Sequence, residues 1–167
     1  LLADRVRDTD AHVVFTAHSL PERILDEGDP YRDQLLETAR LVADSAGLED
    51  WSFSFQSESP TGEPWLGPDI LDHLTDLAGR GVEEVLVCPI GFVCDHVEVL
   101  YDLDVEAAAV GREVGLTMVR AEAVNDDPRF LDTMARAVMQ TWNRYRSGIP
   151  LSLAPVRRGK QERMAEF

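Results

Sequence analysis

Short apolar runs alternate along the chain with longer segments whose apolar residues recur at helical spacing. The runs predicted as strands are residues 12–17, 51–55, 84–89 and 116–120. The segments predicted as helices are residues 29–47, 69–79, 95–111 and 127–145. Strands that alternate with helices of roughly ten or more residues are typical of βαβ units. We therefore predict an α/β fold, with a parallel sheet and helices on both of its faces.

Residues that start and end helices support these boundaries. An Asp-Pro pair stands at 29–30 and again at 127–128, where Asp would cap the helix and Pro would take its first position. Gly47 suits the end of a helix, because glycine readily adopts the left-handed conformation found there. We predict a domain over residues 1–146 and a loosely held tail over 147–167, which carries prolines and a basic cluster.

The composition is that of a globular and strongly acidic protein. Of 167 residues 44% are hydrophobic, and 31 Asp and Glu against 16 Lys and Arg give a formal net charge of −15. Such a charge argues against nucleic acid or an anionic membrane as a partner, but it is compatible with a cationic substrate. No apolar run approaches the roughly 20 residues of a membrane span, so we expect a cytoplasmic protein without one. The two cysteines give no reason to predict a disulfide.

Three carboxylates follow the strand at 84–89. Glu98, Asp102 and Glu106 stand four residues apart, which on an α-helix would place them on one face, about 6 Å from each to the next. Like charges at this spacing destabilise a helix by about 0.2–0.5 kcal/mol per pair, so such a row does not contribute to the stability of the fold. The row is either a solvated helix face or a track for cations and protons.

A candidate base stands at the end of the first strand. His18 follows an apolar run that stops at a His-Ser pair. In open α/β sheets, groups that handle ligands lie just beyond the carboxyl ends of the strands. We therefore expect His18 and the acidic segment after the strand at 84–89 to converge on one crevice.

Several spaced motifs, in the same order along the chain, resemble those of ferrochelatases. They are TAHSLP at 16–21, GDPY at 28–31, FQS at 55–57, PWLGP at 64–68 and CPIGFVCDHVEVLYDLD at 88–104. The likeness runs from about residue 12 to about residue 146 and covers the carboxyl-terminal half of that family's chain. Because the chain also lacks an initial Met and opens on what reads as the end of a helix, we expect it to be half of a larger protein.

The resemblance implies a fold of two similar Rossmann-like, chelatase-like halves around a porphyrin cleft. It also implies a lyase of haem biosynthesis that inserts Fe²⁺ into coproporphyrin III or protoporphyrin IX, with loss of two pyrrole protons. Such a site needs a base at the ring, ligands that hold iron loosely and a route for protons. The implied partners are the porphyrin, ferrous iron and the missing amino-terminal half, and no cofactor is expected beyond the Fe²⁺ substrate.

The resemblance also assigns roles to single residues. His18 matches a histidine that would accept a pyrrole proton or hold the metal, and Glu98 matches its partner carboxylate across the cleft. Asp102 and Glu106 match an acidic line behind it, on a helix that the family often distorts with a π-bulge. The predicted metal-holding set is therefore His18, Glu98, Asp102 and Glu106. Trp65 matches an aromatic residue near the substrate pocket.

The remaining histidines and cysteines, and Asp95, are not assigned a role in catalysis. Asp95 and His96 are placed at the mouth of the acidic helix. Cys94, where relatives more often carry a smaller residue, is interpreted as a packing residue, like Cys88 in its apolar strand. Some ferrochelatases hold a [2Fe–2S] cluster on cysteines near the carboxyl end, but no cysteine follows Cys94, so no cluster is expected here. His12 and His73 are expected to be structural or exposed.

Two other functions remain open. One is a related chelatase that places cobalt or iron in a cobalamin or sirohaem precursor, against which the PWLGP and DHVE runs argue. The other is a porphyrin- or metal-binding half-domain without turnover. We expect the isolated chain to fold and to bind a cation weakly at His18 and Glu98, without catalytic turnover.

Overall fold

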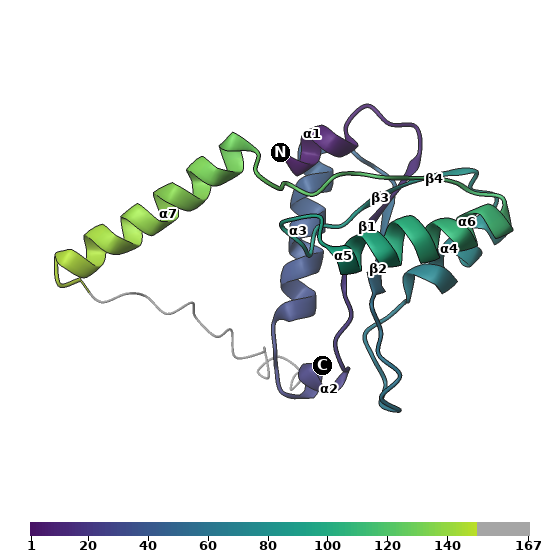
Figure 1. Ribbon diagram of the computed structural model, residues 1–167, viewed down its shortest axis with the longest axis horizontal. Coiled ribbons are helices and arrows are strands. Elements are labelled where there is room, and N and C mark those ends of the chain that lie inside the picture. The colour runs from purple at the N-terminus through teal and green to yellow at the C-terminus, as the bar shows by residue number, and fades with distance from the viewer. Residues whose placement is uncertain (150–167) are drawn as a thin grey trace, which may run out of the picture.

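The computed structural model describes residues 1–149 of the chain and gives them an α/β architecture (Figure 1). Four parallel strands form one sheet in the order β2-β1-β3-β4. The strands are β1 (His12–His18), β2 (Trp51–Gln56), β3 (Glu84–Cys88) and β4 (Thr117–Arg120). The helices are α1 (Leu2–Val6), α2 (Arg23–Asp26), α3 (Tyr31–Ala46), α4 (Ile70–Gly79), α5 (Val97–Val99), the π-helix η1 (Leu100–Ala107), α6 (Ala108–Val114) and α7 (Pro128–Arg146).

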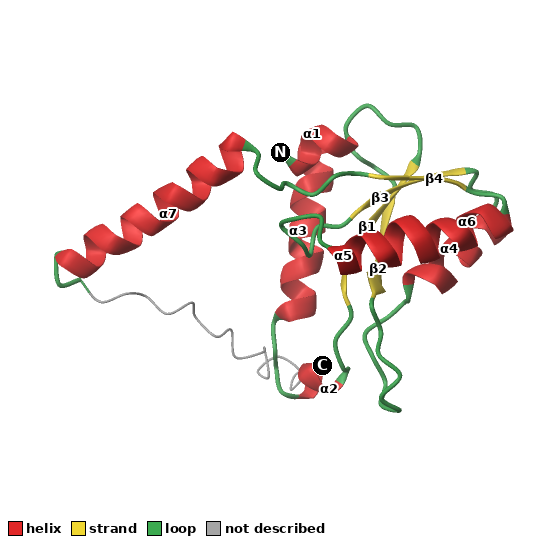
Figure 2. Ribbon diagram, viewed as in Figure 1, coloured by secondary structure: helices red, strands yellow, loops and turns green. Residues whose placement is uncertain are grey.

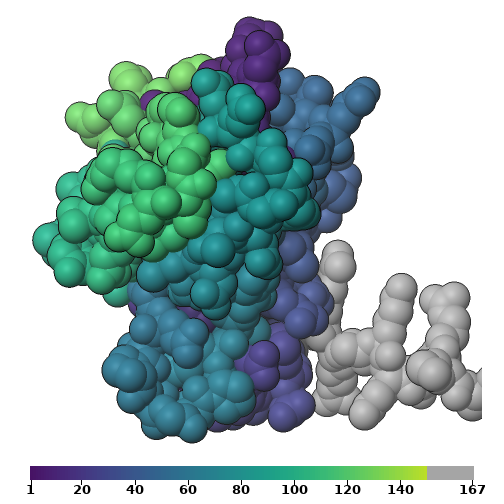
Figure 3. Space-filling view, turned by 90° about the vertical axis from the view of Figure 1, so that its right-hand side faces the viewer, coloured from purple at the N-terminus to yellow at the C-terminus, as the bar shows by residue number. Residues whose placement is uncertain are grey.

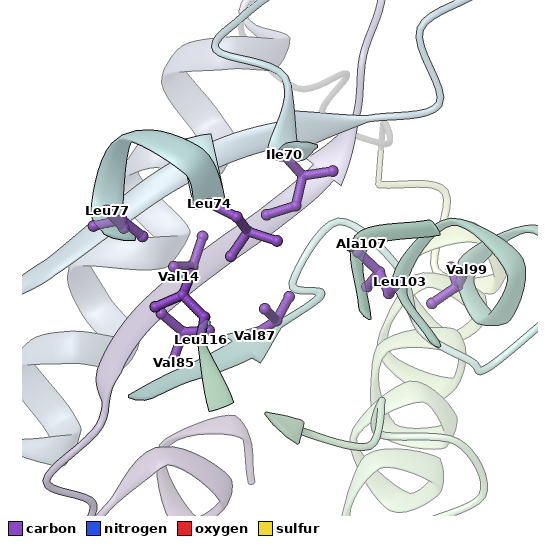
Figure 4. Close-up of a cluster of buried hydrophobic side chains, with 10 residues drawn as sticks. All are labelled: Val14, Ile70, Leu74, Leu77, Val85, Val87, Val99, Leu103, Ala107 and Leu116. Atoms are coloured by element: carbon purple, nitrogen blue, oxygen red, sulfur yellow. The ribbon is translucent and has the colours of Figure 1, made fainter. Parts of the chain in front are cut away.

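Helices cover both faces of the sheet, as the sequence predicted (Figure 2). Successive side chains of a strand point to opposite faces. Val13 and Phe15 of β1 therefore pack on the side of α1 and α3, while Val14 packs with α4, η1 and the partner strand β3 on the other. Figure 4 shows this second cluster, in which Leu74 and Leu103 reach the sheet from two different helices. Figure 3 shows the surface that these helices present to solvent.

The strand order creates a switch point at the centre of the sheet. From β1 the chain moves to one neighbour, β2, and it later returns to the other neighbour, β3. In the register Phe15 pairs with Cys88, so β3 ends beside Phe15 and β1 continues past it to His18. In open α/β sheets the crevice at such a point is where ligands bind. The loops after His18 and Cys88 both leave from this crevice.

Most predicted helix boundaries are confirmed. The Asp69 and Asp127 carboxylates accept hydrogen bonds from the backbone N–H groups of Leu71 at 2.8 Å and Arg129 at 2.9 Å, as helix caps do. Gly47 closes α3 in the left-handed conformation, with φ of 76°. The start of α3 differs by one residue, because Pro30 lies before the helix. The short helix α2 was not predicted.

The predicted helix over residues 95–111 has other bounds, and its middle carries the π-helical distortion that the resemblance implied. The segment begins at Val97, after His96 in an extended conformation, and it ends at Val114. Its middle is the eight-residue π-helix η1, in which hydrogen bonds reach back five residues instead of four. At the end of η1, the N–H of Ala108 donates to the carbonyl of Leu103. The regular α-helical spacing expected for Glu98, Asp102 and Glu106 therefore does not apply.

The last helix, α7, projects away from the sheet (Figure 1). None of its 19 residues is buried. At its start, the Arg129 guanidinium contacts Asp4 of α1 at 2.9 Å. Residues 147–149 form a turn after α7, while the rest of the predicted tail lies outside the described residues. Over residues 1–149, every helix is too short or too polar to cross a membrane.

Candidate functional site at the carboxyl ends of β1 and β3

The two predicted segments converge as expected. His18 is the last residue of β1, and Glu98 lies in α5, beyond the end of β3. The Nε2 atom of His18 lies 3.2 Å from Oε1 of Glu98, across 80 residues of sequence. The side chains are 31% and 48% exposed, so the pair is held by the fold and still accessible to a ligand.

The surroundings of His18 define which of its ring nitrogens faces Glu98. Nδ1 lies against the carbonyl oxygen of Ser19, which can only accept, so we place a ring proton on Nδ1. In the neutral ring Nε2 then carries a lone pair directed at a carboxylate. Two acceptors at this distance need a proton or a cation between them. The pair is therefore arranged to take up one or the other.

The backbone around His18 is held from both sides. The Tyr31 hydroxyl donates to the carbonyl of His18 at 2.9 Å, and burial raises the pKa of this phenol. The buried Ser19 hydroxyl donates to the carbonyl of Leu66 at 2.7 Å. These contacts fix where β1 ends and restrict the position from which the imidazole can reach Glu98.

A glycine lets the loop after β3 pass over the end of β1. A Cβ atom on Gly91 would lie 2.5 Å from Cβ of Ala17, closer than any side chain tolerates. The Gly91 N–H donates to the carbonyl of Thr16 at 3.1 Å in this crossing. Phe92 follows, with its ring 6.5 Å from that of His18 and 5.0 Å from that of His96. Gly91 and Phe92 were not among the predicted site residues, although a glycine just beyond a buried strand is a signal of close backbone approach.

The three acids of the predicted track have different surroundings. Glu98 faces His18, whereas Asp102 is half-buried and accepts hydrogen bonds from the Ser57 hydroxyl and, at 3.4 Å, from the Gln56 amide. Glu106 is exposed. Across residues 1–149, no three His, Cys, Asp or Glu side chains meet closely enough to hold a metal ion. The predicted four-residue metal set thus contains one close pair, one anchored acid and one solvent-facing acid.

Comparison with known proteins identifies the family. The family model described as Ferrochelatase matches residues 2–142. The chain belongs to the ferrochelatase family. The resemblance found in the sequence motifs is confirmed, and it extends over the whole sheet and most of α7.

Individual ferrochelatases are similar over most of this chain. The ferrochelatases of Deinococcus radiodurans and Herpetosiphon aurantiacus are each 52% identical to it, over 149 and 126 residues that make up 82% and 75% of the chain. The coproporphyrin III ferrochelatase of Bacillus subtilis is 41% identical over an alignment of 152 residues that covers 84% of the chain. These regions make up 47%, 41% and 49% of the three relatives. The chain therefore spans less than half of their length.

Trp65, the predicted substrate-binding aromatic of this ferrochelatase chain, is half-buried in the loop between β2 and α4. Its indole N–H donates to the Thr61 hydroxyl at 2.9 Å, and its backbone forms an isolated bridge with Pro21. Trp65 thus ties its loop to the segment that follows His18. A role in binding substrate stays a prediction.

Asp95 lies directly before His96, the residue that precedes the first residue of α5, and its carboxylate is held by several polar groups. Arg120 of β4 contacts it at 2.7 Å, and the Asn125 amide and Ala123 N–H donate to it at 2.8 and 3.2 Å. Burial would raise the pKa of Asp95, but these hydrogen bonds and the Arg120 charge outweigh burial and lower it. Arg120 also contacts Asp104 of η1 at 2.7 Å. This arginine therefore fastens the acidic segment to the edge of the sheet.

The two cysteines of this ferrochelatase chain have opposite environments. Cys88 is buried at the end of β3, as predicted, and burial raises the pKa of its thiol to about 12. The packing interpretation of Cys94 is wrong, because the turn that carries it faces solvent. Both thiols are free.

Proposed function

We propose that this chain supplies one wall of a ferrochelatase active site, where it accepts protons from a porphyrin and passes Fe²⁺ to the ring. The observation that carries the proposal is the 3.2 Å approach of His18 Nε2 to Glu98 Oε1 at the switch point of the sheet. Metal insertion replaces two N–H protons of the porphyrin by one Fe²⁺ ion, so two protons must leave. An imidazole lone pair backed by a carboxylate provides the acceptor that this step needs.

Proton release follows from the same geometry. Nδ1 of His18 stays hydrogen-bonded to the Ser19 carbonyl, so a proton taken from the porphyrin arrives on Nε2 of the imidazole. The Glu98 carboxylate stabilises the resulting imidazolium and can accept its proton. Asp102, which is half-buried, and Glu106, which is exposed, follow Glu98 in η1. We assign to these two carboxylates the outward passage of protons and the inward passage of the cation.

Iron is a substrate of this reaction and must be released to the porphyrin, so a weakly binding pair of donors suits it. Imidazole and carboxylate both bind Fe²⁺, which accepts nitrogen and oxygen donors. A pair of ligands, without a third among residues 1–149, holds a cation less firmly than a structural site with four ligands would. Weak retention favours transfer to the four nitrogens of a porphyrin.

A second wall must come from outside this chain. The chain spans less than half of its relatives, and α7 displays an unburied apolar stripe. This stripe, hereafter the α7 stripe, consists of Leu131, Met134, Val138, Met139, Trp142 and Tyr145. Exposed stripes of this kind mark surfaces that another protein element covers. We assign the α7 stripe to contact with the polypeptide equivalent to the remaining half of the relatives, and we expect no turnover from this chain alone.

Cation binding tests the core of the proposal. Calorimetric titration of the 167-residue chain with Co²⁺, an air-stable surrogate of Fe²⁺, is expected to reveal one weak site. His18→Ala and Glu98→Gln should each weaken it at least about tenfold, because each removes one member of the close pair. Glu113→Gln, which neutralises an exposed acid on α6, is the matched control and should have no effect. Equal affinity in all four proteins would contradict the proposal.

Turnover provides the second test. The chain alone should insert no metal into a porphyrin, and addition of the other half as a separate polypeptide should restore insertion. Robust insertion by this chain in monomeric form would show that the second wall is dispensable.

A further inference from the structure

Asp102 is held in a way that its neighbours in the acidic line are not. Both of its hydrogen bonds fall on one carboxylate oxygen, Oδ2, which accepts from the Ser57 hydroxyl and from Nε2 of Gln56 at 3.4 Å. Over residues 1–149, Oδ1 accepts no hydrogen bond. The carboxylate is thus fixed through one oxygen, and the other remains available.

A buried chain of hydrogen bonds determines the orientation of Gln56. Thr16 of β1 and Gln56 of β2 are both fully buried. The Thr16 hydroxyl donates to Oε1 of Gln56 at 3.0 Å, so the Nε2 group at the other side of the amide must point towards Asp102. A buried amide needs such partners, because an unsatisfied one is costly. The direction of this donor is therefore set inside the sheet.

Ser57 adds a second donor from an unusual backbone conformation. Its φ of 64° lies in the left-handed region, which residues other than glycine, Asn and Asp seldom adopt. This conformation accompanies the turn of the chain at the end of β2 and brings the hydroxyl onto Oδ2 of Asp102. A locally unfavourable conformation that presents a polar group is a recurrent feature of functional sites.

We propose that Gln56 and Ser57 are positioning residues, which hold the Asp102 carboxylate through Oδ2 so that Oδ1 faces a divalent cation moving past Glu98. This inference rests on the proposed cation path through Glu98 and Asp102. Through their hydrogen bonds to Asp102, the two donors also connect η1 to the end of β2. Groups that orient a metal-binding carboxylate typically change metal affinity by about 10–100-fold when removed.

The sheet offers a matched control for the Ser57 hydroxyl. Ser54 lies three residues earlier, and its hydroxyl is buried without a hydrogen-bond partner among residues 1–149. Ser54→Ala removes the same atom from the same segment without touching Asp102. Ser57→Gly removes the Ser57 hydroxyl while it relaxes the backbone, so comparison with Ser57→Ala separates the hydroxyl from the conformation.

The test is Co²⁺ titration of the full 167-residue chain, followed by calorimetry and by the visible spectrum of bound Co²⁺. Ser57→Ala, Ser57→Gly and Gln56→Met should each weaken binding about tenfold or more, whereas Ser54→Ala should not. In an Asp102→Ala background, Ser57→Gly should cause no further loss, because the acceptor of the Ser57 hydroxyl is gone. A general structural role would weaken binding in both backgrounds. Circular dichroism checks that every variant is folded. If Gln56→Met does not fold, Ser57→Gly still tests the positioning role.

Two results would overturn the inference, and they can be told apart. If the unmodified chain binds Co²⁺ and the Ser57 variants behave like Ser54→Ala, the positioning role is wrong while the proposed function stands. If the unmodified chain binds no Co²⁺, the proposed cation path fails and the positioning role fails with it.

Discussion

Gly91 and Ala17 approach so closely that a Cβ on the glycine would lie 2.5 Å from Cβ of the alanine. This crossing sets the distance between the end of β1 and the loop that leads to Glu98. The His18–Glu98 pair therefore depends on a contact between two small residues that carry no polar side chain.

Gly91→Ala is expected to destabilise the protein and to disturb the site at once. The added methyl group must displace the loop or β1, which costs about 1–3 kcal/mol in a packed region. Urea unfolding should show that loss, and Co²⁺ titration should show weaker binding. Gly79→Ala is the control, since a Cβ there meets nothing within 4 Å. A helical position gains up to about 1 kcal/mol from this change. Equal stability of the two variants would contradict the close approach.

Asp95 should make the protein sensitive to mild acid. Its folded-state pKa lies below the ordinary value of 3.8, so the stability that it contributes is present above that value. This stability is lost as the pH falls through the folded-state pKa, because the unfolded chain binds the proton more readily. Urea unfolding between about pH 5 and pH 2 should show a shallower decline for Asp95→Asn than for the unmodified chain. The same slope in both proteins would exclude this contribution.

His73 should give a second pH dependence, at higher pH. Its Nε2 lies 2.8 Å from the Ser52 hydroxyl, which also contacts His12 at 2.8 Å. Burial, then the charges of Arg80 and His12, lower its pKa from the ordinary 6.5. The folded state resists protonation, so stability should decline as the pH falls from about 6.5 towards the folded-state pKa. His73→Asn should flatten unfolding curves in this interval, and an unchanged slope would contradict the lowered pKa.

The α7 stripe should control association with the proposed partner, the polypeptide equivalent to the remaining half of the relatives. Val138→Asp places a charge where we expect apolar contact and should weaken association about tenfold or more, since each tenfold change corresponds to about 1.4 kcal/mol. Gln140→Asp adds the same charge on the opposite side of the helix, by its periodicity of 3.6 residues, and should have little effect. Analytical ultracentrifugation of mixed halves would measure both. Similar losses in the two variants would argue against the stripe as the interface.

Local sequence signals predicted the fold well because each acts over a few residues. Apolar runs marked the strands, and Asp69 and Asp127 marked helix starts through side chains that bond two residues ahead. The convergence of His18 and Glu98 was also predictable. Parallel strands bring their carboxyl ends to one edge, whatever the sequence separation.

The features that were missed arise from contacts between distant segments. An acidic row at intervals of four residues fits an α-helix, and the π-helical turns of η1 were implied only by the resemblance to ferrochelatases, not by the local pattern of residues 98–106. Asp102 of η1 is bonded to Gln56 and Ser57, which lie more than 40 residues earlier in the chain. Cys94 was misassigned for a related reason, since exposure of a turn residue depends on what the rest of the fold leaves uncovered.

A site made of one imidazole and one carboxylate cannot rank metals in favour of iron. Divalent ions follow a general order of affinity in which Fe²⁺ lies below Co²⁺, Ni²⁺ and Cu²⁺, and a pair such as His18 and Glu98 imposes too little geometry to reverse it. If the proposed function holds, the identity of the inserted ion is decided by which ion is supplied to the pair. The supply of metal ions would then determine specificity in place of the pair itself.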